Sequence, residues 1–111
     1  MKAFDDAKYI GVVRHFLEAN GESRFQELPK GQPIPNRAGL RKQSNGHTEY
    51  LILPEIFYNE VSKGFDPRQV TAALAKLGHL KTDQGRLTKQ VRIAGMGQVR
   101  VYAVQDTIFS E

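Results

Sequence analysis

The chain has 111 residues, a net charge of +4 at pH 7 and no cysteine, and its length corresponds to one domain. The absence of cysteine excludes disulfides, thiolate chemistry and cysteine zinc sites, and no apolar run approaches the roughly 18 residues of a transmembrane helix. The N-terminal stretch MKAFDDAKYI lacks the apolar region of a secretory signal. We therefore expect a cytoplasmic protein.

A helix is predicted for residues 3–19, because apolar residues recur there at helical spacing. Asn20 and Gly21 supply its C-terminal stop. The apolar positions are Tyr9, Ile10, Val13, Phe16 and Leu17.

Residues 22–46 are expected to form an insertion between this helix and the strand that follows it. Three prolines and one glycine in PKGQPIPN make residues 29–36 a loop. Asn45-Gly46 predicts a hairpin turn between two extended runs. The second run, residues 48–53, is rich in Thr, Tyr, Ile and Leu, which favour strands.

Two helices are predicted next. Pro54 suits the first turn of one helix, which ends at Gly64. The second begins at Asp66, which can cap it, with Pro67 at its first position and Gln69 at the capping-box position. Because only two residues separate the helices, they should cross at a large angle, as in a helix-turn-helix.

The second of these helices has an apolar stripe of Val70, Ala73, Leu74 and Leu77. Its outward face is small and basic, which suits a recognition helix in a major groove. Alanine is also the best helix former, so a slim face has a purely structural explanation. The outward face is expected to show Arg68, Thr71, Ala72, Ala75, Lys76 and His79.

A β-hairpin is predicted after Leu80, where the apolar pattern changes to a period of two. The order helix, strand, helix, helix, strand, strand is that of an α+β winged helix, with the hairpin as the wing. We therefore expect residues 1–111 to form a single winged-helix-like domain.

The wing is basic and contains no acid between Gly85 and Val104; its cations are Arg86, Lys89, Arg92 and Arg100. With Gly95, Met96 and Gly97 as the tip, Val91 should pair with Val101, and Ile93 with Val99. Those four side chains would form an apolar face that closes on the helices. Met96 would be exposed, where it could touch a groove or a partner.

That register sets Arg92 directly opposite Arg100. Like charges in such a pair repel by a few tenths of a kcal/mol or more. A phosphate between the two guanidinium groups would turn the repulsion into attraction.

The overall distribution of charge agrees with this interpretation. Residues 65–104 hold seven basic and two acidic residues, whereas residues 1–34 hold five of each. A localised basic patch is the electrostatic signature of a nucleic-acid binder, although a solvated surface without a ligand would show the same count.

Enzymatic chemistry is not predicted. The chain has no P-loop, and we find no nucleophile–base pair. His15, His47 and His79 lie far apart in sequence, without metal-ligand spacing. We expect no catalytic residue, no cofactor and no metal.

Four segments in order carry a resemblance to a known family: VRHFLEANGESRF, NRAGLRK, EYLILPEIFYNEVSKGFDPRQVTAALAKLGHL and GRLTKQVRIAGMGQVRVYAV. Over roughly residues 12–104 they resemble the C-terminal end of a primase–helicase family of prophages and integrating elements. That family is catalogued under a domain of unknown function and has a helicase-like ATPase core. The resemblance implies a role in the replication or mobilisation of mobile DNA. This sequence lacks the ATPase core, so the resemblance assigns it no ATP hydrolysis or unwinding.

These observations predict a non-catalytic accessory module that binds duplex or forked DNA, mainly through phosphates. The expected DNA contacts are Arg68, Thr71 and Lys76 on the helix and Arg86, Lys89, Arg92 and Arg100 on the wing.

The alternative is a module that docks a helicase-like ATPase core or another replication protein. A continuous exposed apolar patch through Ala72, Ala75 and the first helix would favour docking. A free-standing transcriptional regulator is a third interpretation, and it requires a dimerisation element. No membrane partner is expected.

Overall fold

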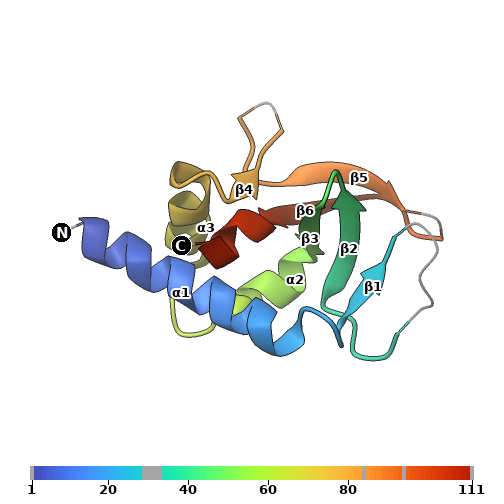
Figure 1. The fold of residues 1–111 in the computed structure, drawn as a ribbon, viewed down its shortest axis with the longest axis horizontal. Helices are drawn as coiled ribbons and strands as arrows, with labels where there is room; N and C mark the ends of the chain where they lie inside the picture. Colours follow the sequence, from blue (N-terminus) through green and yellow to red (C-terminus); the bar gives the residue numbers. More distant parts are fainter. Residues whose placement is uncertain (1, 29–33, 84, 94, 111) are drawn as a thin grey trace.

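The computed structural model describes residues 2–28, 34–83, 85–93 and 95–110. Its helices gather toward one end of the molecule and most of the sheet lies toward the other (Figure 1). The elements are α1 (Lys2–Asn20), β1 (Phe25–Glu27), β2 (Gly39–Ser44), β3 (His47–Ile52), α2 (Pro54–Ile56), the π-helix η1 (Phe57–Val61), α3 (Pro67–Lys76), β4 (Leu80–Lys81), β5 (Lys89–Ile93), β6 (Gly97–Gln105) and the 3-10 helix η2 (Asp106–Ser110).

Strand β6 organises the sheet. The strand order is β1-β2-β3-β6-β4, and β5 pairs with the earlier part of β6. Only β1 and β2 are parallel, and the other described pairs are antiparallel. Two helical segments, α2–η1 and α3, connect β3 to β4. This is the winged-helix arrangement, so the predicted α+β fold is confirmed.

The larger core lies between the helices and one face of the sheet. Val13 of α1, Phe57 of η1 and Leu74 of α3 are fully buried in it. Tyr102 and Val104 of β6 project into the same core. The predicted first helix is confirmed, and its amphipathic pattern is explained by this packing.

The helix that begins at Pro54 is confirmed, but most of it has π geometry. The N–H of Ser62 donates to the carbonyl of Phe57 at 3.0 Å, and the Ser62 hydroxyl donates to the same oxygen at 2.8 Å. Such π turns are rare and are usually confined to one turn. Gly64 follows with φ 88°, a left-handed conformation that glycine adopts at little cost.

The Asn45-Gly46 turn is also confirmed. Strands β2 and β3 pair from Gly39–Ile52 to Ser44–His47, with the turn between them. Of the predicted loop 29–36, residues 29–33 lie outside the described part of the structure.

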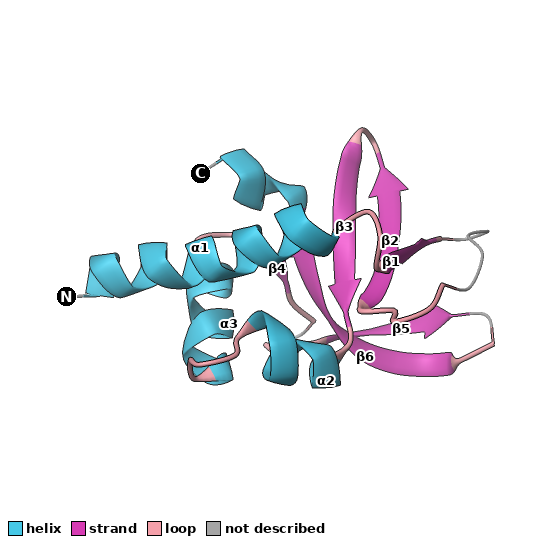
Figure 2. Cartoon of the chain, turned by 90° about the horizontal axis from the view of Figure 1, so that it is seen from below, coloured by secondary structure: helices cyan, strands magenta, loops and turns pink. Residues whose placement is uncertain are grey.

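The wing packs across the other face of the sheet, which makes the expected contact with the helices wrong. Figure 2 shows β5 and the adjacent part of β6 running across the direction of β2 and β3. Side chains alternate along β6, so those on its second face, away from the helices, form another core. That core contains Leu40, Leu51, Ile93, Val101 and Ala103. The reason is that Leu40 and Leu51 point away from the helices, so their apolar side chains are shielded from solvent by the wing.

The predicted wing register is wrong by two residues. Ile93 pairs with Gly97, and Val91 with Val99. The N–H of Met96 donates to the carbonyl of Ile93 at 2.9 Å, so the turn closes earlier than predicted. Gly97, with φ 75°, then becomes the first residue of β6. A shift of two residues preserves the faces, so the alternation was correct although the partners were not.

Candidate nucleic-acid interface

Helix α3 begins as the sequence predicts, but Gln69 has another role. The carboxylate of Asp66 accepts a hydrogen bond from the N–H of Arg68 at 3.0 Å, and Pro67 is the first helical residue. The side-chain oxygen of Gln69 accepts from the hydroxyl of Tyr9. Gln69 thus joins α3 to α1, and its proposed place in a capping box is not seen.

A narrow exposed stripe runs along α3. Arg68, Ala72 and Lys76 recur every four residues, which places them on one side of the helix, and all three are exposed. The side chain of Arg68 is 93% exposed and lies 4.0 Å from Asp66. Lys76 is 61% exposed and pairs with Asp6 of α1 at 2.9 Å. The stripe therefore presents one almost unrestrained guanidinium group and one ammonium group that pairs with Asp6 but remains mostly exposed.

Thr71 does not belong to this surface, contrary to the prediction. It is 2% exposed, and its hydroxyl donates to the carbonyl of Arg68 at 3.1 Å. Leu77, predicted to be in the apolar stripe, is 40% exposed. The buried side of α3 is therefore made by Val70, Thr71, Ala73 and Leu74. Leu77 is not buried with them because it is the C-cap residue, where the backbone leaves the helical path.

His79 is also buried, at 4% exposure, so its expected outward position is wrong. Its Nδ1 lies 2.8 Å from the hydroxyl of Thr107, and its carbonyl accepts from the N–H of Gln105. These contacts fix the end of the helix-turn-helix to the last segment of the chain. Ala75 is half-buried and packs on the larger core, so it does not extend an exposed apolar patch from Ala72.

The outward face of the wing carries two arginines that are not opposite each other. Arg92 pairs with Gln98, and Arg100 pairs with Gln90. The two glutamine side chains hydrogen-bond at 3.0 Å. The expected direct repulsion between arginines is therefore absent, because the shifted register places them diagonally.

The two wing arginines differ in freedom. Arg100 is half-buried and donates to the hydroxyl of Thr88 at 3.2 Å. Arg92 is exposed and, within the described residues, makes no side-chain hydrogen bond or ion pair. Arg86 is exposed on the connection between β4 and β5, where its backbone pairs with that of Asp83 in an isolated β-bridge. That connection rises above the sheet in Figure 1.

Lys89 is not the unneutralised wing cation that the sequence suggested. Its Nζ lies 3.7 Å from Glu49 of β3, with 28% of the lysine and 13% of the glutamate side chain exposed. Glu49 lies forty residues earlier in the chain, so counting acids within the hairpin could not find it.

Met96 is half-buried rather than exposed. It packs on the second core, and Arg37 lies with its Nη2 3.4 Å from the Met96 sulfur. The tip of the wing is thereby held against the segment that leads into β2.

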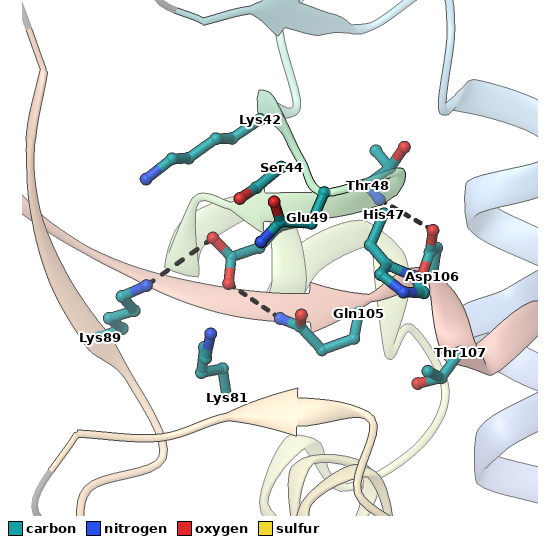
Figure 3. Close-up of a pocket in the computed structure, with 11 residues that line it drawn as sticks. Lys42, Ser44, His47, Thr48, Glu49, Lys81, Lys89, Gln105, Asp106 and Thr107 are labelled. Carbon is teal, nitrogen blue, oxygen red and sulfur yellow. Dashed lines mark hydrogen bonds and ion pairs between the residues drawn. The ribbon is translucent and has the colours of Figure 1, made fainter.

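A cleft opens on the second face of the sheet, close to Lys89. It has a volume of about 350 Å³. Figure 3 shows Lys42, Lys81 and Lys89 around Glu49, from strands β2, β4, β5 and β3. We call this the lysine cleft. A carboxylate oxygen of Glu49 accepts from the amide of Gln105 at 2.9 Å.

Lys42 and Lys81 were missed by the sequence reasoning. The Asn45-Gly46 turn does imply that Lys42 pairs with Glu49, and the structure has this pair. No local pattern places Lys81 beside them, because β4 joins the group only through its pairing with β6.

One ion pair that changes a carboxyl pKa lies away from these basic surfaces. Arg24, just before β1, contacts Glu60 of η1 with both guanidinium Nη atoms, at 2.6 and 3.1 Å. This hydrogen bonding lowers the pKa of Glu60 below its ordinary value. The pair ties the start of the insertion to the helix-turn-helix.

Within the described residues, no cluster of three or more His, Cys, Asp or Glu is arranged to hold a metal ion. None of the helices in that part of the chain is both long and apolar enough to cross a membrane.

Comparison with known proteins identifies relatives of this fold. The family described as the Cch helix-turn-helix domain matches residues 6–107. A solved structure described as "SCCmec type IV Cch - active helicase" is similar with a TM-score of 0.62 and 21% sequence identity. The similarity covers 94% of this chain and 19% of that chain, so this chain spans about a fifth of its length. No curated protein matches.

Proposed function

Because the chain belongs to the family of Cch helix-turn-helix domains, we propose that it is a non-catalytic DNA-binding module of a helicase-like protein from a mobile element. The observation that carries the proposal is the exposed stripe of Arg68, Ala72 and Lys76 on α3. This is the second helix of the helix-turn-helix, the one that enters the major groove in such domains.

The stripe suits contact with the DNA backbone better than reading of bases. Ala72 keeps the middle of the face slim, so the helix backbone can approach the groove. Arg68 and Lys76 stand at its two ends, where they reach phosphates. With so few polar groups to address base edges, affinity is expected to be modest and strongly dependent on salt.

The wing adds phosphate contacts through Arg86, Arg92 and Arg100. Arg86 and Arg92 are the strongest of these candidates, because both are exposed and neither makes an ion pair within the described residues. Lys89 is only 28% exposed and faces Glu49 on the second face of the sheet, whereas Lys76 remains 61% exposed beside Asp6. Thr71 lies on the buried side of α3. We therefore leave both out of the proposed duplex contact.

The helicase-like protein would supply ATP hydrolysis. The resemblance to the C-terminal end of prophage and integrating-element primase–helicases agrees with this division of roles. On that basis the module acts in the replication or mobilisation of mobile DNA, on duplex or forked substrates.

Docking to the ATPase core is the second candidate. It is favoured by Leu77 and Leu87, which are 40% and 36% exposed. It is weakened by the partial burial of Ala75, which interrupts the exposed apolar patch that docking through α3 would need.

Fluorescence anisotropy with a labelled DNA duplex, at low and at physiological salt, tests the proposal. We expect the wild type to bind at low salt and to lose affinity as salt rises. The double variant Arg68→Ala, Lys76→Ala should bind several-fold more weakly. Its slope of log affinity against log salt should be shallower by about 0.9 for each phosphate contact removed.

The matched control is Lys42→Ala, Lys81→Ala, which removes the same charge from the second face of the sheet. It should bind the duplex like the wild type. Absence of wild-type binding at low salt would refute the proposal, and so would equal losses in the two double variants. Pull-down by the helicase-like core would then favour docking.

A further inference from the structure

The lysine cleft differs from the exposed surface of α3 because it is concave and is lined by several cations. Three ammonium groups face one carboxylate, that of Glu49 (Figure 3). The other acid in the wall is Asp106, whose oxygens are engaged by the N–H of Thr48 at 2.8 Å and by His47 at 3.3 Å. Three lysines against these two acids leave the cleft with one formal positive charge in excess.

Two of the three lysines have no partner among the residues that the structure describes. Glu49 pairs with Lys89 at 3.7 Å and accepts from Gln105. Within the described residues, Lys42 and Lys81 make no ion pair or side-chain hydrogen bond, and both are exposed. Strand pairing nevertheless directs them to the same face of the sheet, beside Glu49.

A second hollow of about 480 Å³ adjoins the cleft. The two hollows share Lys42, Glu49 and Lys89. The second adds Arg92 at its rim and an apolar floor that includes Leu51 and Val91. Cations thus line both of these adjoining hollows, which together we call the groove.

We propose that this groove binds the phosphates of a single nucleic-acid strand, with one phosphate held between Lys42 and Lys81. Lysine acts on phosphate as a mobile point charge, and the hydroxyl of Ser44 in the same wall can donate to it. The inference deepens the proposed function, because it adds a strand-binding site to a module that addresses duplex through α3.

The size and lining of the groove favour a strand over a duplex. Each hollow has the volume of a small-molecule site, which admits nucleotide units one at a time. The described lining of both hollows contains no Phe, Tyr or Trp. Of the described lining, only the His47 imidazole and the Arg92 guanidinium group offer a plane on which a base could stack. Recognition should therefore depend mainly on phosphates, with little base preference.

The test uses the whole chain and three labelled probes: short oligo-dT, a duplex and a polyglutamate peptide. We expect Lys42→Ala, Lys81→Ala to weaken oligo-dT binding several-fold, with a salt slope shallower by about 0.7 per lost phosphate contact. Duplex binding should not change. Arg68→Ala, Lys76→Ala is the charge-matched control and should spare oligo-dT. Both lysines are exposed, so unchanged thermal unfolding would verify that the variant folds.

Competition against labelled oligo-dT distinguishes binding of a nucleic-acid strand from binding of free phosphate. Inorganic phosphate should displace oligo-dT better than sodium chloride at equal ionic strength, and less well per phosphate than an unlabelled strand. Amide NMR shifts should change at Ser44 and Glu49 with both phosphate ligands.

Equal losses of oligo-dT binding in the two double variants would overturn the inference, since they would show attraction by net charge alone. Polyglutamate binding as tight as oligo-dT would also overturn it, in favour of an acidic protein partner. Because the duplex is measured separately, failure at the cleft leaves the proposal for α3 intact, and failure at α3 leaves the cleft intact.

Discussion

Helix α3 and the β5–β6 wing are both basic, but they expose their charge in different ways. On α3, one side is buried in the larger core and the opposite side presents Arg68 and Lys76 to solvent. The wing is covered on its inner face by Leu40 and Leu51. Lys89 of the wing is only 28% exposed beside Glu49, whereas Lys76 of α3 remains 61% exposed beside Asp6. The helix therefore displays its cations, whereas the wing uses part of its surface to complete the fold.

This difference shows that charge in a sequence is not the same as charge available to a ligand. Two wing cations have internal partners, Lys89 with Glu49 and Arg100 with Thr88. Two lysines outside the wing's strands, Lys42 and Lys81, have none within the described residues. The partners are set by strand pairing, which brings together residues from distant parts of the chain.

The largest expected effect is a loss of stability when the core beneath the wing is disrupted. Leu51→Ala on the second face and Leu74→Ala on the helical face should each reduce the free energy of unfolding by about 2–5 kcal/mol. Both side chains are buried, at 1% and 0% exposure. Urea denaturation measures the two losses under the same conditions.

Leu87→Ala provides the control, because Leu87 is 36% exposed and its loss should change stability by about 0.5 kcal/mol or less. A loss below about 1 kcal/mol for Leu51→Ala, beside a large loss for Leu74→Ala, would contradict the comparison. It would mean that the wing is free in solution and that Leu51 is exposed there.

The two regions also differ in how far the sequence could predict them. The start of α3 depends on neighbouring residues, so Asp66 and Pro67 were identified correctly. In the wing, the alternation of faces is local and was predicted, but the register depends on where the turn closes at Ile93 and Met96. That choice involves packing of the tip against Arg37, which no local pattern reveals.

The candidate site divides in the same way. Exposure of Arg68 and Lys76 was predictable from helical spacing. Burial of Thr71 and His79 was not, because it depends on the structure packed around α3, including Thr107 at the other end of the chain. The lysine cleft needed four strands in place before its cations could be recognised as neighbours.

A smaller effect should follow from removing the local signal that defines α3. Asp66→Ala deletes the cap on the N–H of Arg68 and should cost about 1 kcal/mol of stability. Asp66→Asn retains a capping oxygen and should cost much less. Thermal unfolding of the two variants checks this, and equal losses would show that the carboxylate charge, not the cap, is what stabilises the helix.

The smallest effect concerns an ion pair on the helical side, the counterpart of Lys89–Glu49 on the wing side. Hydrogen bonds from Arg24 hold the pKa of Glu60 below its ordinary value of 4.5. A carboxyl with a lowered folded-state pKa stabilises the fold above its unfolded-state pKa and loses that contribution as pH falls through the folded value. Glu60 is 39% exposed, so the contribution should be only about 0.5 kcal/mol.

Glu60→Gln should therefore be slightly less stable than the wild type near neutral pH. The difference should shrink as pH falls below 4.5, because the wild-type carboxyl then becomes neutral as well. Urea midpoints across this range measure it, and a difference independent of pH would assign the effect to lost hydrogen-bond geometry instead of charge.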